Sequence, residues 1–417
     1  MPKRYYNKRL LDLFIEYMGV TSIPRQYLTW SFLSTLGACL NDRGIYENNA
    51  GKVLYPNLYV LLVGPSGIGK DSAIDAATDL VEETKYVNPY YGKLTGAALA
   101  DMLGRAEARA ASIEKRPTIW LIFPELANSF GNANQADDFI KRLTAMAHPK
   151  KRAYQEHTRG LMQESGELSY AAPIIHAIFG STQAWLLDTV KHEQVQSGLF
   201  ARMFVVEARR NYKNRVVDPR RPQGWEKMEA ELKLRLKELF SLCGIFARTK
   251  QCNKVREHWV LSREAPQSEV EAPMWERQPE LTDKLAMLLS DTVQYGAEDY
   301  LITTPVWNEA RHMVLETHRN FLDLYKWGSR VSQATRDVET VAGVIRDAGR
   351  IPHSPLLKRA NHRGINAEGV KRALGELEGR NEILVDKIHT NNTKSKRTSV
   401  YTWAAFAHEF DEVRGGD

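Results

Sequence analysis

One stretch decides the fold of this 417-residue chain, and it reads Leu58-Tyr59-Val60-Leu61-Leu62-Val63-Gly64-Pro65-Ser66-Gly67-Ile68-Gly69-Lys70. The part up to Val63 is continuously apolar, which is typical of a strand covered on both faces. Three glycines follow in close succession, and helical periodicity begins at Asp71. The sequence therefore predicts a buried strand, a glycine-rich turn and a helix in immediate succession.

The glycine-rich turn has the composition of a phosphate-binding loop. A bound phosphate needs several donors that converge on one point, and consecutive backbone N–H groups at a helix N-terminus supply them. Glycines let the backbone approach the ligand, and Lys70 can reach the β- and γ-phosphates of a nucleotide. We predict that this loop binds ATP through Gly64, Pro65, Ser66, Gly67, Ile68, Gly69, Lys70, Asp71 and Ser72. The alternative is a plain glycine-rich turn, which would not require a strand before it and a helix after it.

The residue after Lys70 departs from the usual pattern of such loops. A serine or threonine normally contacts Mg²⁺ at this place, whereas this chain has Asp71 followed by Ser72. An aspartate can hold Mg²⁺ directly or through water, because hard cations favour oxygen ligands. We therefore expect Mg²⁺ at Asp71 or Ser72, with an altered coordination geometry.

Strands and helices alternate after the loop. Apolar runs recur at residues 118–123, 174–179 and 203–206, and helical stretches cover residues 71–83, 97–111, 136–147 and 184–190. This alternation predicts an α/β fold with a mainly parallel sheet and helices on both faces. Helical periodicity also covers residues 7–40 with a break at Ile23-Pro24, residues 225–242 and residues 281–324. The pattern of residues 253–279 predicts no definite structure.

A carboxylate follows the apolar run 118–123. In P-loop motors a strand next to the loop strand usually ends in Asp-Glu, where the Asp holds Mg²⁺ and the Glu polarises the attacking water. Here Pro124 takes the place of the Asp, and Glu125 remains. Glu125 is the candidate base that activates water, and an ordinary strand-end carboxylate is the alternative. If Asp71 supplies the missing metal contact, the two departures compensate for each other.

Two further polar positions complete the candidate site. Gln183 or Thr182, after the run 174–179, is expected to sense the γ-phosphate or orient water, unless Thr182 or Ser181 simply caps the next helix. Arg202 directly precedes the run 203–206. Ring-forming ATPases place an arginine finger there, which stabilises the charge of the transferring phosphoryl group on a neighbouring subunit. A surface arginine or a structural salt bridge is the alternative.

These motifs resemble a phage- and plasmid-encoded family of P-loop ATPases that are often described as replicative helicases or primase-helicase ATPases. The resemblance covers roughly residues 8–330 and rests on residues 30–36, 57–70, 123–126, 179–183 and 198–204. The Leu-x-x-Arg-x-Phe element also resembles MCM-type AAA+ helicases. The resemblance implies a P-loop NTPase core of the AAA+ or RecA-like kind, and ATP-driven DNA unwinding or translocation by a ring, expected to be a hexamer. Other replication proteins would be its partners.

The last part of the chain has the pattern of a winged helix-turn-helix. Helical stretches at residues 335–347, 354–360 (with Ser354 as the expected N-cap) and 367–378 precede strands at residues 383–388 and 398–403. This order and a basic hairpin suit DNA contact, although winged helices also serve as protein-interaction modules. The candidate DNA-binding residues here are Lys371, Arg372, Lys394, Lys396 and Arg397. A second basic cluster, either a channel-facing loop or a solvated one, has Lys150, Lys151, Arg152 and Arg159.

Length and composition set the remaining expectations. We predict an N-terminal helical segment at residues 1–50, an ATPase core at 51–210, a helical extension at 211–330 and the winged-helix domain at 331–417. The formal charge of +6 permits nucleic-acid contact without proving it. Three widely spaced cysteines fit neither a disulfide framework nor a zinc site. No apolar run is long enough to span a bilayer, so we expect a cytoplasmic protein without membrane contact.

Two other functions stay open. A helicase loader or origin-binding initiator also needs ATP and a winged helix, but would not unwind processively. A nucleotide-gated DNA-binding regulator would bind ATP without hydrolysing it, which Pro124 favours.

Overall fold

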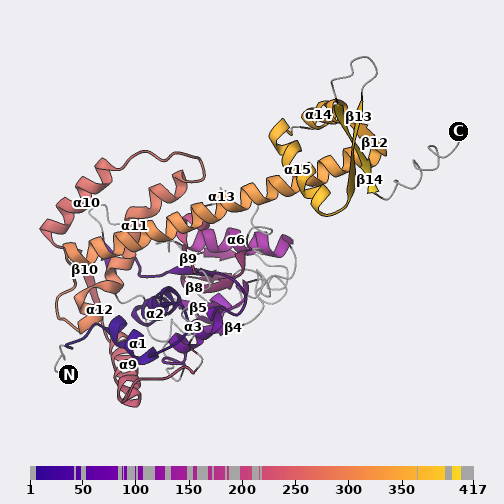
Figure 1. The fold of residues 1–417 in the computed structure, drawn as a ribbon. Coiled ribbons are helices and arrows are strands. Elements are labelled where there is room, and N and C mark those ends of the chain that lie inside the picture. The colour runs from indigo at the N-terminus through magenta and orange to yellow at the C-terminus, as the bar shows by residue number, and fades with distance from the viewer. Residues whose placement is uncertain are drawn as a thin grey trace. The chain divides into compact units, whose positions relative to one another are not determined.

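The chain divides into two compact units, Met1–Asp323 and Leu324–Asp417 (Figure 1). The computed structural model describes residues 6–41, 44–47, 53–82, 87, 89–91, 99, 102–106, 118–126, 133–147, 154–156, 168–170, 173–183, 186, 198–208, 216, 218–363, 365–389 and 397–404. None of the helices in these ranges combines the length and the apolar character that a bilayer crossing requires.

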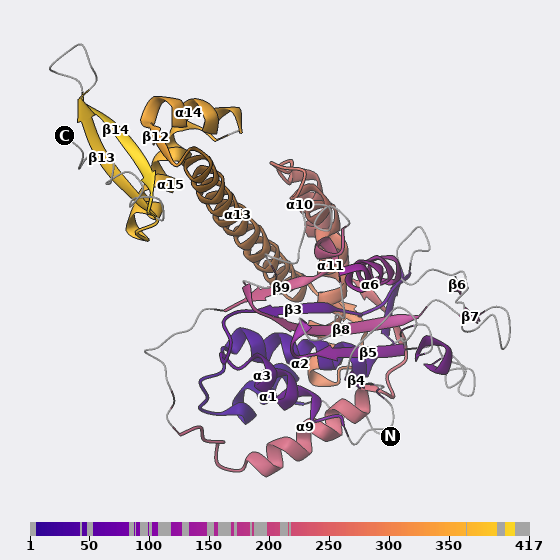
Figure 2. The ribbon, with the colours of Figure 1, turned by 90° about the vertical axis from the view of Figure 1, so that its right-hand side faces the viewer.

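A five-stranded parallel sheet forms the centre of the first unit. Its strand order is β4 (Pro89–Tyr91), β5 (Thr118–Phe123), β8 (Ile174–Ser181), β3 (Tyr59–Val63) and β9 (Phe204–Glu207), as Figure 2 shows. All four neighbouring pairs are parallel. The predicted α/β fold with a mainly parallel sheet is confirmed. The four longest strands are the predicted apolar runs, and the short edge strand β4 was not predicted.

Helices cover both faces of this sheet. On one face lie α1 (Leu10–Met18), α2 (Arg25–Leu40) and α3 (Lys70–Thr78), and the indole N–H of Trp120 donates to the Ser34 hydroxyl of α2 at 3.1 Å. On the other face, the Tyr59 hydroxyl donates to the Leu143 carbonyl of α6 (Ala133–Met146) at 3.3 Å. Since alternate residues of a strand point to opposite faces, most side chains of β3, β5 and β8 need to be apolar, which explains their long apolar runs.

A smaller sheet and several helices complete the first unit. The sheet has the order β11 (Leu301–Ile302), β10 (Gly244–Arg248), β1 (Gly44–Glu47) and β2 (Val53–Leu54). The helices are α9 (Trp225–Leu239), α10 (Lys250–Ser262), α11 (Ala272–Leu289) and α12 (Asp291–Tyr295), and a separate hairpin pairs β6 (Tyr154–Glu156) with β7 (Leu168–Tyr170). Two expectations need correction. Residues 253–279 belong largely to α10 and α11, and the helical pattern at 281–324 is divided by breaks at Ser290 and at residues 296–303, which include β11.

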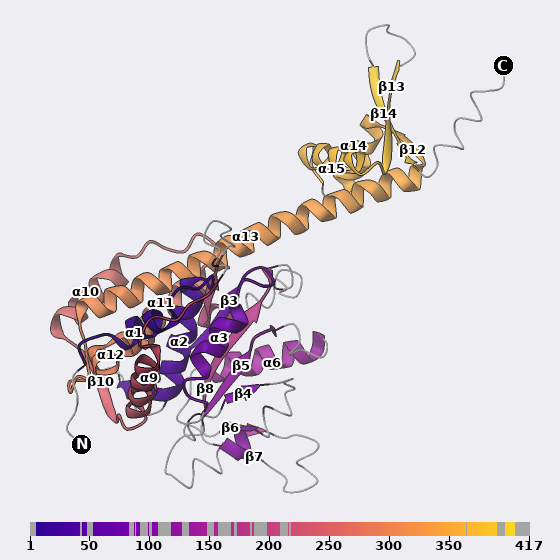
Figure 3. The same ribbon diagram turned by 60° about the horizontal axis from the view of Figure 1, so that its bottom comes forward.

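The second unit contains the end of the long helix α13 (Thr304–Ala348) and a small antiparallel sheet. The sheet has the order β12 (Arg350–Pro352), β14 (Arg397–Trp403) and β13 (Ile383–His389), and α14 (His353–His362) and α15 (Ala367–Gly379) accompany it (Figure 3). The Asn366 side chain caps α15 by accepting from the Gly369 N–H at 2.8 Å. The expected cap of α14 at Ser354 is wrong, because that helix begins earlier and its N-cap is Pro352.

Candidate functional site

The phosphate-loop motif connects β3 to α3, as the sequence predicts. Gly69 is the N-cap of α3 and has φ 92°, a left-handed conformation that side chains rarely adopt. At Gly64 a side chain is excluded by lack of space, because an added Cβ atom would lie 2.3 Å from the Tyr27 hydroxyl oxygen. That hydroxyl donates to the Val63 carbonyl at 2.6 Å. The loop therefore rests on α2 at its start, and Ile23 contacts it at Gly69.

Lys70 lies across the loop that it follows. Its ammonium group donates to the carbonyls of Gly64 and Pro65, both at 2.9 Å. The residue is only 8% exposed. Burial lowers the pKa of Lys70, while the neighbouring charges of Asp71 and Glu125 act in the opposite direction. The cation is thus held at the mouth of the loop, close to two carboxylates.

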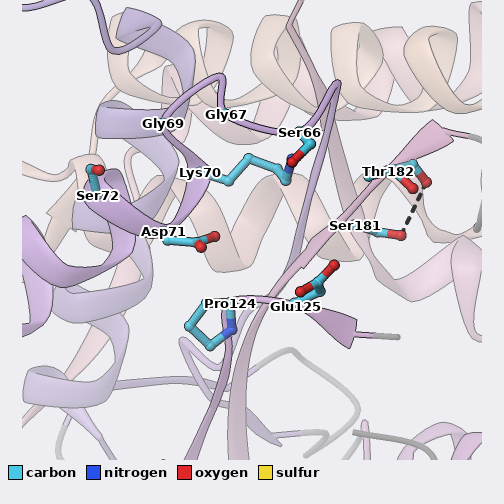
Figure 4. A pocket seen from close by; sticks show the side chains of 10 residues that line it. All are labelled: Ser66, Gly67, Gly69, Lys70, Asp71, Ser72, Pro124, Glu125, Ser181 and Thr182. Carbon is cyan, nitrogen blue, oxygen red and sulfur yellow. Dashed lines mark hydrogen bonds between the residues drawn. The ribbon is translucent and has the colours of Figure 1, made fainter. Parts of the chain in front are cut away.

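A cavity of about 240 Å³ opens beside the loop. Its lining combines the loop, the start of α3 and the ends of β5 and β8, with Ser66, Gly67, Gly69, Lys70, Asp71, Ser72, Pro124, Glu125, Ser181 and Thr182. Figure 4 shows the Asp71 and Glu125 carboxylates directed into this space, whereas the Ser72 hydroxyl lies on the other side of the helix start from Glu125. Successive helical residues point about 100° apart, which separates these two side chains.

Glu125 reaches the cavity from a strand that is not adjacent to the loop strand. We expected its strand to lie next to the loop strand, but β8 lies between β5 and β3. Neighbouring strands are about 4.8 Å apart, so β5 ends roughly 10 Å across the sheet from the start of the loop. This separation leaves room for a phosphate group and a water molecule between Lys70 and Glu125.

Of the two candidates after β8, Thr182 lines the cavity and Gln183 does not. The Gln183 side-chain amide instead donates to the Glu207 carboxylate at the end of β9, at 2.6 Å. The Ser181 hydroxyl, which also lines the cavity, donates to the Thr182 carbonyl at 3.1 Å. Ser181 and Thr182 therefore lie on the same side of the cavity as Glu125, at the ends of the neighbouring strands β8 and β5, and Asp71 lies across the space from them (Figure 4).

Arg202 lies away from this cavity. It ends the short 3-10 helix Phe200–Arg202, and Met203 separates it from β9. β9 is parallel to β3, so the beginning of β9 lies at the amino ends of the strands. The loop lies at the opposite side of the sheet, where the carboxyl ends are. The guanidinium donates to the Gly198 carbonyl at 2.7 Å, and burial lowers its pKa, as does the nearby Arg277 of α11. Arg202 thus cannot act on the nucleotide bound by the same chain.

The candidate metal ligands are few. No group of three or more histidine, cysteine, aspartate or glutamate side chains in the described ranges is arranged to hold a metal ion. A cation in the cavity would depend on Asp71, with Glu125 on the opposite side and phosphate oxygens of the nucleotide completing the shell. This donor set is all oxygen, as Mg²⁺ prefers, so the residues fit a Mg²⁺–nucleotide better than they fit a free metal ion.

The predicted DNA-binding residues have four different outcomes. Lys371 on α15 is exposed and has no ion pair with any described residue. Arg372 instead pairs with the buried Asp337 carboxylate of α13 at 3.0 Å. Arg397 begins β14, opposite His389. Four residues between β5 and β8 and two in the C-terminal hairpin lie outside the described residues, namely Lys150, Lys151, Arg152, Arg159, Lys394 and Lys396.

The sequence did not indicate the residues that support the loop. Tyr27 of α2 and Ile23, just before that helix, lie next to the loop although they come more than 30 residues earlier in the chain. Neither residue belongs to a recognisable pattern, so no local signal marks them. A scan of known protein families finds no family model that matches the chain, and a search of the curated proteins finds no match either.

Proposed function

We propose that this protein binds Mg²⁺–ATP at the loop formed by residues 64–72 and hydrolyses it. The observation that carries the proposal is the convergence of Lys70, Asp71 and Glu125 on one cavity at the carboxyl ends of β3, β5 and β8. In open α/β sheets, ligands bind at the carboxyl ends of the strands. The loop amides at the start of α3 would hold the phosphates, and Lys70 would bring positive charge to them.

In this proposal Glu125 is the general base. A water molecule between Glu125 and the γ-phosphate attacks phosphorus, the bond from phosphorus to the oxygen of ADP breaks, and the Glu125 carboxylate accepts the proton of the water. Thr182 orients the water or the γ-phosphate, a role that Gln183 is less suited to because its amide already donates to Glu207. Asp71 would hold Mg²⁺, the role that P-loop motors usually give to an aspartate at the position of Pro124.

Steady-state ATP hydrolysis tests this site. We expect turnover that requires Mg²⁺, that Lys70→Ala abolishes by loss of binding, and that Glu125→Gln abolishes while ATP still binds. If Asp71→Ala keeps full Mg²⁺-dependent turnover, the metal role of Asp71 is wrong. If the wild-type protein hydrolyses no ATP with any DNA present, the whole proposal is wrong.

We further propose that the protein acts on DNA as a ring-forming helicase or translocase. The order of α14, α15, β13 and β14 is that of a winged helix-turn-helix, and the exposed cations Lys358, Arg359, Lys371 and Lys387 have no ion pair with a described residue. Such free cations suit DNA phosphates. Arg202 lies at the amino ends of the strands, away from the loop. This position agrees with action on a neighbouring subunit's nucleotide, which requires an oligomer.

The two alternatives make different predictions. A helicase loader or origin-binding initiator would hydrolyse ATP and bind duplex DNA, but would not separate strands. A nucleotide-gated regulator would bind ATP and DNA without turnover. A strand-displacement assay with a forked duplex separates the helicase from the loader. Comparison of ATP turnover by the wild type and Glu125→Gln separates both from the regulator.

A further inference from the structure

Gly180 is the residue of β8 that meets the end of β5. An added Cβ atom at Gly180 would lie 1.9 Å from the carbonyl oxygen of Pro124 and 2.9 Å from its carbonyl carbon. Both atoms belong to the backbone, so no flexible side chain can give way. The chain of β5 therefore passes directly over the Cα atom of Gly180 at the place where it leaves the sheet, immediately before Glu125.

This contact fixes the direction of Glu125. The proline ring holds φ of Pro124 near −65°, and the carbonyl lying on Gly180 restricts ψ of the same residue. The peptide that joins Pro124 to Glu125 is planar, so a fixed carbonyl also fixes the N–H and the Cα of Glu125. The backbone thereby determines where the Glu125 carboxylate enters the cavity (Figure 4).

Pro124 also explains why the strand ends here. Proline has no N–H and cannot continue the ladder between β5 and β8, and β5 ends at Phe123, which pairs with Phe179. β8 continues to Ser181 and pairs with β3 on its other side, Gly180 lying opposite Leu62. The crossing at Gly180 is therefore set by Pro124, which stands where P-loop motors usually have a metal-binding aspartate.

We propose that Pro124 and Gly180 are a matched pair of positioning residues that hold Glu125 at its reacting distance from the γ-phosphate. This inference rests on the proposed ATP hydrolysis and goes beyond it, because it assigns a positioning role to two residues that have no part in the proposed chemical step. A methyl group at Gly180 must displace the end of β5 by roughly 1.5 Å to reach an ordinary contact distance. A misplacement of about 1 Å can reduce turnover on the order of 100-fold.

The test is Gly180→Ala, measured by kcat for ATP hydrolysis and by the Kd of Mg²⁺–ATP. We expect kcat to fall about 10- to 100-fold, while Kd changes less than about threefold. The reason is that the added methyl group clashes with Pro124 at the end of β5, and not with the loop, Lys70 or α3. Gly343→Ala on α13 is the matched control. Its added Cβ would meet only the Arg363 Nη1 atom, at an ordinary 3.8 Å, and should leave both values unchanged.

A second variant keeps the test valid if Gly180→Ala does not fold. Pro124→Gly introduces no clash but frees φ at residue 124, and it should lower kcat about 10-fold at unchanged Kd. In the double variant the losses should be less than multiplicative, because both act through the same peptide. Full activity of Pro124→Gly, or of a folded Gly180→Ala, would overturn the inference and leave ATP hydrolysis standing. Absence of hydrolysis by the wild type would overturn the proposed function itself.

Discussion

Replacement of Lys70 by methionine is expected to remove most of the nucleotide affinity and leave the fold intact. The side chain keeps an unbranched apolar stem that is one atom shorter, and the main loss is one buried ammonium group that donates two hydrogen bonds of 2.9 Å to the loop carbonyls. Two unit charges 4 Å apart attract each other by about 4 kcal/mol at an effective dielectric constant of about 20.

The net loss on binding is smaller than this attraction, because the ammonium gives up contacts with Gly64 and Pro65 when it turns to phosphate. A remaining difference of about 3 to 4 kcal/mol corresponds to a 100- to 1,000-fold increase in Kd. Isothermal titration with Mg²⁺–ATP measures it directly. Lys254→Met on the exposed face of α10 is the control and should bind as the wild type does. A folded Lys70→Met variant whose Kd stays within threefold of the wild type would refute the assignment of the loop.

The remaining predictions concern other parts of the chain. Lys371→Ala should weaken duplex DNA binding and reduce the slope of log K against log salt by about 1, whereas Arg372→Ala should chiefly lower thermal stability, because this arginine pairs with a buried carboxylate. Asp283→Ala should lower the free energy of unfolding by about 3 to 5 kcal/mol, because it leaves its arginine partners uncompensated. Burial lowers the pKa of His176 to about 3 and of His318 to about 4. Below pH 6.5 the unfolded chain therefore binds protons that the folded chain does not, and each histidine should cost about 2 kcal/mol of stability at pH 5.

Each of these expectations has a decisive measurement. Fluorescence anisotropy at several salt concentrations separates the two basic residues of α15, and an unchanged salt slope for Lys371→Ala would contradict its role. Urea unfolding measures the Asp283 variant, and a loss under 1 kcal/mol would contradict the buried ion pairs. Urea unfolding at pH 7.5 and pH 5 measures the histidines, and replacing both by leucine should flatten the difference.

The elements with a continuous apolar pattern were the ones that the sequence predicts well. β3, β5, β8 and β9 are almost wholly buried, so nearly all of their side chains are apolar and the pattern is unambiguous. β4 was missed because it is short, lies at an edge and is partly exposed, as its residues Pro89 and Tyr90 are. The order of the strands was not predictable either, because it depends on contacts between segments far apart in the sequence.

The helix α11 shows a different limit of sequence reasoning. Pro279 lies inside it and leaves the Trp275 carbonyl without its usual helical donor. The Arg263 guanidinium replaces this donor, with a hydrogen bond of 2.6 Å to the Trp275 carbonyl, and stacks on the Trp275 ring at 3.8 Å. A proline-containing, glutamate-rich stretch thus becomes helical through a tertiary contact, which no local pattern reveals.

At the candidate site, the sequence located the residues but not their relations. Lys70, Asp71, Glu125 and Thr182 were named from motif positions, and the structure brings these residues to one cavity. The order of the strands explains two contacts that the sequence did not reveal. Gln183 donates a hydrogen bond to Glu207, and the end of β5 lies over Gly180. Such relations need the packed sheet, since they join residues that are far apart along the chain.

One measurement tests the central proposal most directly, and it follows binding and hydrolysis in the same sample. The protein is mixed with Mg²⁺ and ATP labelled at the γ-phosphate, with and without forked DNA, and bound nucleotide and released phosphate are both counted. We predict that the wild type binds ATP and releases phosphate, and that Glu125→Gln binds ATP equally well but releases phosphate at least 100-fold more slowly. Equal release by both proteins, or no bound ATP in either, would contradict the account.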